Sequence, residues 1–134
     1  MWKNVEHIGI AVKDLNGVNE IYTKLFGEGP YKLESVDTEQ VDTSFFKVGG
    51  TKIEFLSATD PNSAIAKFID KRGEGIHHIA FEVEDIHYEL ERLQEEGFQF
   101  TRPEVSKGAD NKLVCFVHPK SANGVLVELC QEIK

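Results

Sequence analysis

Hydrophobic residues alternate with polar or small residues in two segments, 5–12 and 76–83. In the first segment Ile8 and Ile10 would face one side of a sheet, and His7 would face the other. Successive side chains of a β-strand point to opposite faces, so this alternation is typical of a strand with one buried face. The pattern therefore predicts two half-buried strands, one in each half of the chain.

A helical pattern follows each of these strands. Asp14 and Asp85 stand where a helix N-cap belongs, and apolar residues recur at helical spacing after both of them. Gly27 and Gly97 follow the last apolar positions and are expected to end the two helices. A third helix is predicted over residues 64–71, in the connection between the two halves.

Short strand-like runs occupy the rest of each half. They lie near 31–36, 42–48 and 52–57 in the first half, and near 98–101, 112–117 and 125–130 in the second. Each half therefore has the element order βαβββ.

The two halves are copies of one pattern. Segment 5–15 can be laid on segment 76–86, with His, Ile, Val and Asp recurring at the same places. Segment 50–56 matches segment 124–130 in the same way. The sequence therefore predicts an α+β protein built from two paired βαβββ modules.

The lengths of these patterns set the expected limits of each part. The first module is predicted over residues 1–59, a connecting helix and linker over 60–75, and the second module over 76–134. A chain of 134 residues is the usual size of one domain, so the two modules are expected to form a single structural domain.

The repeat brings four side chains of metal-ligand type to equivalent positions: His7, Glu54, His78 and Glu128. Glu54 and Glu128 each stand in the middle of an apolar strand, where an unpaired carboxylate is costly to bury. Pairing the modules about a pseudo-twofold axis would place His7 opposite His78 and Glu54 opposite Glu128. Two imidazoles and two carboxylates suit a divalent transition metal, and an octahedral ion would keep two open positions for a substrate.

One further residue is a weaker candidate. Lys120 lies in a loop after His118, where its cation could meet a carboxylate or phosphate of a substrate, or could simply be a solvated turn residue. Neither a nucleophile elbow nor a dinucleotide-binding fingerprint occurs in the chain.

Composition and net charge limit the classes of binding partner and the cellular setting that are expected for this chain. The net charge of −8 argues against nucleic acid and against an anionic membrane surface. No apolar run approaches the roughly 20 residues that would span a bilayer. The two cysteines are too few for a disulfide framework, so a reducing cytoplasm is the expected setting.

Paired βαβββ modules that carry His7, Glu54, His78 and Glu128 resemble the vicinal oxygen chelate superfamily, also called the glyoxalase/bleomycin resistance/dioxygenase superfamily. The resemblance covers essentially the whole chain and includes both glyoxalase I and methylmalonyl-CoA epimerase. It implies a cupped mixed sheet with flanking helices around a divalent metal, and a substrate with two adjacent oxygens.

Two members of the superfamily compete. Segments 75–80, 116–121 and 124–129 resemble the epimerase. The ligand set resembles glyoxalase I instead, because the epimerase pattern carries Gln where this chain has Glu54. That pattern also carries a catalytic Glu at a position that a count along the chain assigns to Ser44 here. Since function resides in the site rather than in the scaffold, the sequence favours glyoxalase I, also named lactoylglutathione lyase.

This resemblance implies a specific reaction. The hemithioacetal of methylglyoxal and glutathione would isomerise to S-lactoylglutathione by proton transfer through an enediolate, in a methylglyoxal detoxification step. Glu128 would be the base and Glu54 its counterpart, and both would also ligate the metal together with His7 and His78. Nickel is the expected ion, with cobalt or zinc as alternatives, and a homodimer is the expected assembly.

Three alternatives remain beside glyoxalase I. The first is methylmalonyl-CoA epimerase. The second is a ring-cleaving dioxygenase, which usually needs only one carboxylate ligand. The third is a small-molecule binding module without enzymatic activity.

Overall fold

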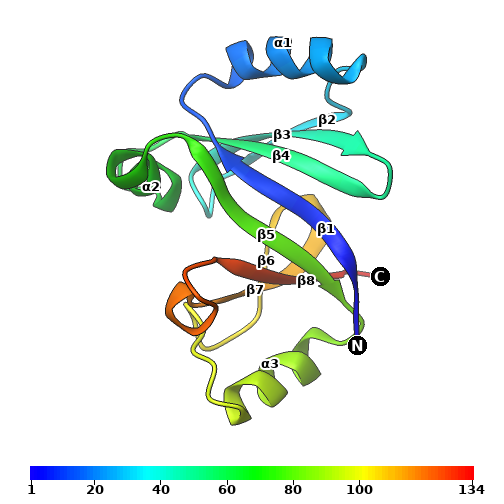
Figure 1. Cartoon of the computed structure of the whole chain (residues 1–134), viewed down its shortest axis with the longest axis vertical. Coiled ribbons are helices and arrows are strands. Elements are labelled where there is room, and N and C mark those ends of the chain that lie inside the picture. Colours follow the sequence, from blue (N-terminus) through cyan, green and yellow to red (C-terminus); the bar gives the residue numbers. More distant parts are fainter. The chain divides into compact units, whose positions relative to one another are not determined.

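The computed structural model describes all 134 residues (Figure 1). The strands are β1 (Trp2–Ala11), β2 (Lys32–Val36), β3 (Val41–Val48), β4 (Thr51–Ala58), β5 (Gly75–Val83), β6 (Ser106–Lys107), β7 (Lys112–Val117) and β8 (Val127–Glu132). The helices are α1 (Leu15–Phe26), α2 (Ala64–Arg72) and α3 (Ile86–Glu95), with short 3-10 turns η1 (Ala109–Asn111) and η2 (Pro119–Ser121). None of these helices is long and apolar enough to cross a membrane.

The chain forms two compact units, each with its own set of strands. The first unit is His7–His77. The second unit joins Met1–Glu6 to His78–Lys134, so β1 gives its first residues to the second unit and the others to the first. The single-domain organisation stays a prediction.

In the first unit the strands lie in the order β2-β3-β4-β1, with β1 parallel to β4 and the other pairs antiparallel. Helix α1 packs on one face of this sheet, where Tyr22 contacts the buried rings of Phe46 and Phe55. Helix α2 packs on residues of the opposite face, where Ile65 joins Val41 in a second apolar cluster. The two helices of this unit therefore pack on opposite faces of its sheet.

The second unit repeats this order as β5-β8-β7-β6, with β5 parallel to β8. Helix α3 packs on one face through Ile86, Leu90 and Leu93, against Leu129 and neighbouring apolar residues of β7 and β8. The α+β class and the two βαβββ modules, with mixed sheets and flanking helices, are therefore confirmed.

The N-caps predicted at Asp14 and Asp85 are confirmed. An oxygen of Asp14 accepts a hydrogen bond from the Gly17 backbone N–H at 3.1 Å, and Asp85 accepts one from Tyr88 at the same distance. Gly27 ends α1 in the left-handed conformation, at a φ of 79°.

One predicted strand is wrong. Residues 98–101 form no strand, and Phe100 makes only a single bridge to Val117. Pro103 has no backbone N–H to continue a ladder, and pairing with β7 resumes only in the two-residue β6. Residues 98–101 themselves contain no strand breaker, so Pro103, two residues farther along, is the signal in the sequence that the strand does not continue.

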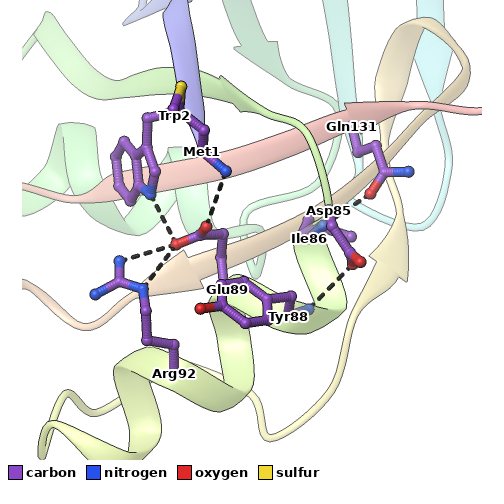
Figure 2. A network of polar contacts seen from close by, with 8 residues as sticks. All are labelled: Met1, Trp2, Asp85, Ile86, Tyr88, Glu89, Arg92 and Gln131. Atoms are coloured by element: carbon purple, nitrogen blue, oxygen red, sulfur yellow. Dashed lines mark hydrogen bonds and ion pairs between the residues drawn. The ribbon is translucent and has the colours of Figure 1, made fainter.

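A buried carboxylate fastens the start of the chain to α3 within the second unit (Figure 2). Glu89 is only 3% exposed at its side chain and accepts hydrogen bonds from the Met1 ammonium (3.3 Å), the Trp2 indole (3.0 Å) and the Arg92 guanidinium (2.8 Å). Burial by itself would raise the pKa of Glu89, but these donors outweigh it and hold the pKa below its ordinary value. The network therefore depends on the charged form of this carboxylate.

Candidate metal centre

In the first unit, His7 and Glu54 form a close pair. They lie on the parallel neighbours β1 and β4, where Gly9 is the register partner of Glu54. Because Gly9 has no side chain, the imidazole two residues earlier can reach across to the carboxylate. Nδ1 of His7 lies 3.1 Å from Oε2 of Glu54, and the two residues are 5% and 4% exposed.

The second unit contains the equivalent pair. His78 lies on β5 and Glu128 on its parallel neighbour β8, with the small Ala80 as the register partner of Glu128. Nε2 of His78 is 3.2 Å from Oε1 of Glu128, and both residues are 5% exposed. The ring of Phe116 stands edge-on to the His78 imidazole, with the ring centres 6.0 Å apart.

Each pair fits two neighbouring positions around a divalent ion. Ligands at about 2.1 Å from a metal and at right angles to one another lie about 3 Å apart, which matches the nitrogen–oxygen contacts of both pairs. His7, Glu54 and His78 are all buried, and each offers one ligand atom to a possible metal. Glu128 is also buried and carries a carboxylate. The donor chemistry therefore suits a divalent metal in both units.

In the absence of a metal, both buried thiols are protonated at neutral pH. Burial, reinforced by the Glu128 carboxylate, raises the pKa of Cys115 to about 12 and that of Cys130 well above its usual range. The Cys130 thiol lies 3.5 Å from the carbonyl oxygen of Phe81. Cys130 is thus a small packing residue beside the pair.

Lys120 lies apart from both pairs in sequence, in the η2 turn. It is exposed, and its backbone N–H donates to Nδ1 of His118 at 3.1 Å. Its role in binding substrate stays a prediction.

Ser44 does not share the face of Glu54, contrary to what a count along the chain suggests. The Ser44 hydroxyl lies 2.6 Å from the Asn19 amide oxygen, on the side of α1. The register pairs Phe45 with Glu54, and alternation then puts Thr43 on the same face as Phe45. Thr43 therefore shares the face of Glu54, whereas Ser44 does not.

Further polar residues that the sequence analysis missed lie on this face. Lys32 on β2 is the register partner of Phe45, and its Nζ stands 5.3 Å from the centre of that ring. The same nitrogen is 3.4 Å from Oε1 of Glu34, two residues along β2. The period-2 pattern of β2 could have placed them on one face, but only the strand order shows that β2 neighbours β3.

Comparison with known proteins identifies the family. Residues 6–116 match the Glyoxalase/Bleomycin resistance protein/Dioxygenase superfamily. The chain is 39% identical over 129 residues to the ethylmalonyl-CoA/methylmalonyl-CoA epimerase of Cereibacter sphaeroides, covering 95% of this chain and 96% of that protein. It is 38% identical over 126 residues to the mitochondrial methylmalonyl-CoA epimerase of Dictyostelium discoideum, covering 93% and 76%.

A solved structure gives the same result. Methylmalonyl-CoA epimerase in complex with methylmalonyl-CoA and NH4+ has a TM-score of 0.94 to this chain at 30% identity, covering 98% of this chain and 96% of the other. This likeness extends over the whole fold.

These relatives correct the predicted activity. The expectation of glyoxalase I (lactoylglutathione lyase), with a hemithioacetal substrate, is wrong, and the epimerase alternative is better supported. The error has a physical cause: the types of the ligands describe what binds the metal, not which substrate approaches it. The count to Ser44 was misleading as well, since that hydroxyl faces α1. The comparisons support an enzyme, and the chain belongs to the glyoxalase/bleomycin resistance/dioxygenase superfamily, the vicinal oxygen chelate superfamily.

Proposed function

We propose that this protein is an epimerase of methylmalonyl-CoA or of a closely related 2-alkylmalonyl-CoA. The observation that carries the proposal is the 39% identity to an ethylmalonyl-CoA/methylmalonyl-CoA epimerase along almost the full length of both chains. The buried His–Glu pair in each module supplies the carboxylates that such a reaction needs.

The reaction inverts one carbon atom. The α carbon of the thioester loses its proton to a carboxylate, and the electron pair of that C–H bond enters the enolate of the thioester. A proton then returns to the opposite face of the same carbon from a second acid, so that atoms and charge balance. We assign the two roles to Glu54 and Glu128, because they are buried carboxylates at equivalent positions of the two modules.

Both pairs are proposed to hold one divalent ion, through His7, Glu54, His78 and Glu128. When bound, the metal supplies Lewis-acid stabilisation of negative charge on the substrate oxygens. The histidines fix the site and do not exchange protons with the substrate. Nickel is the first ion to test, followed by cobalt and zinc, because a mixed nitrogen and oxygen donor set suits all three.

Lys120 is proposed to bind a phosphate of the CoA moiety, since it offers an exposed cation on a short turn. A homodimer is the proposed assembly, and light scattering would measure it.

Exchange of the α proton tests the function directly. Metal-stripped protein is incubated with one epimer of methylmalonyl-CoA in deuterated water, with and without nickel, cobalt or zinc. We expect metal-dependent incorporation of deuterium at the α carbon together with formation of the other epimer. Protein that binds metal but exchanges no proton with any of the ions would overturn the proposal.

A further inference from the structure

The hydroxyl oxygen of Thr43, Oγ1, is buried and has no hydrogen-bond partner. No other buried side-chain nitrogen or oxygen atom of the structure lacks a partner. The residue lies on β3 and is 1% exposed. A buried hydroxyl without a partner costs free energy of folding, so its presence calls for an explanation.

Thr43 lies near Glu54, one of the two proposed acid–base residues. The register pairs Phe45 with Glu54 and Thr43 with Leu56, so Thr43 and Glu54 are diagonal neighbours on one face of the sheet. Diagonal neighbours on antiparallel strands are about 7–8 Å apart. On its other side Thr43 pairs with Glu34, and Lys32 is a further diagonal neighbour.

The second unit has no hydroxyl at the equivalent position. There Phe116 is the partner of Glu128, and Val114 is the partner of Cys130. Val114 therefore occupies the place that Thr43 has in the first unit, and it packs in an apolar cluster with Cys130. Val has nearly the shape of Thr, so both units carry a β-branched residue at this position and only the first unit adds a hydroxyl.

We infer that Thr43 is a substrate-binding residue whose hydroxyl donates a hydrogen bond to the free carboxylate of a malonyl-type acyl group. The carboxylate supplies the partner that the hydroxyl lacks, and Lys32, which also pairs with Glu34, lies on the same face. This inference deepens the proposed function and rests on it for the choice of acyl-CoA as the ligand.

The decisive variant is Thr43→Val, which removes the hydroxyl and keeps the shape. We expect KM for methylmalonyl-CoA to rise about tenfold with kcat within about twofold, because a ground-state contact is lost. Thr43→Ser keeps the hydroxyl and should stay within about threefold of the native KM. The melting temperature of Thr43→Val without ligand should equal or exceed that of the native protein, which a purely structural role of the hydroxyl would not allow.

Thr23→Val is the matched control. Its hydroxyl donates to the Asn19 carbonyl oxygen at 2.6 Å within α1, which packs on the other face of the sheet. This variant should leave KM unchanged.

A binding measurement separates this inference from the epimerase proposal. Malonyl-CoA carries the free carboxylate but has no epimer to form, and acetyl-CoA lacks that carboxylate. The native protein should be stabilised more by malonyl-CoA than by acetyl-CoA in thermal melts, and Thr43→Val should lose this difference. That result would support the inference even if the native protein failed to epimerise methylmalonyl-CoA. An unchanged KM in Thr43→Val, or equal stabilisation of the native protein by both thioesters, would overturn it.

Discussion

Glu128 lies in the middle of an apolar strand at 5% exposure, a setting in which a carboxylate needs a close partner. His78 provides that partner, and the proposed reaction gives the carboxylate its second role as a proton carrier. Glu128→Gln keeps the volume and one ligand oxygen, but an amide cannot take up a proton near neutral pH. We expect deuterium exchange at the α carbon to fall at least about 100-fold while the fold is retained. Glu132→Gln, at the exposed end of the same strand, is the control and should exchange at the native rate.

Glu89 shows how a single buried carboxylate can make stability depend on pH. Because its folded pKa lies below the ordinary value of 4.5, the carboxylate stabilises the fold above the unfolded pKa. That contribution is lost as the pH falls through the folded pKa. Glu89→Gln should lower the free energy of unfolding by about 1–3 kcal/mol at pH 7. The gap to the native protein should narrow as the pH falls below 4.5.

Denaturant titrations at pH 7 and at acidic pH would measure this gap. The exposed Glu91→Gln on the same helix serves as the control and should show little change at either pH. A gap that widened as the pH fell would contradict the assigned direction of the Glu89 pKa.

At the scale of elements, the helix caps predicted from local sequence are formed in the structure. Asp85 caps α3, whose buried face carries much of the second unit's core. Asp85→Ala should cost about 1 kcal/mol of stability, because the Tyr88 N–H loses its acceptor. Asp85→Ser, which keeps an acceptor oxygen, should retain most of it. Thermal melts of both variants would measure the difference, and equal loss in the two would show that the cap bond is not the cause.

The same scale explains what the sequence could and could not predict. Period-2 and helical patterns with Asp caps are local, so the βαβββ order could be predicted from them. The assignment of Ser44 failed because the face of a strand residue depends on register, and the register of β3 is fixed by β4 across a turn. The partner of Thr43 across β2 is likewise a property of strand order. The choice between two substrates failed for a related reason, since the ligand residues do not describe the surface that meets the acyl group.

For the whole molecule, the repeat poses a question of stoichiometry. Each unit carries one imidazole and one carboxylate in contact, and two protein ligands alone make a weak site. The proposal that both pairs share one ion therefore predicts one metal per chain, not two. It also predicts that His7→Ala and His78→Ala lose the ion equally, although they lie in different units.

Metal analysis of desalted protein, together with thermal melts, decides between one shared ion and two separate ones. At a free metal concentration 100 times its dissociation constant, a ligand that binds only the folded state adds about 2.7 kcal/mol to stability. The native protein should gain this increment and lose it to a chelator, whereas both histidine variants should melt alike with and without metal. Lys120→Ala, which changes no ligand, should behave as the native protein does. If each variant kept one ion while the native chain held two, the modules would bind metal separately. The duplication would then have produced two sites, and the shared proton-transfer centre proposed for Glu54 and Glu128 would be wrong.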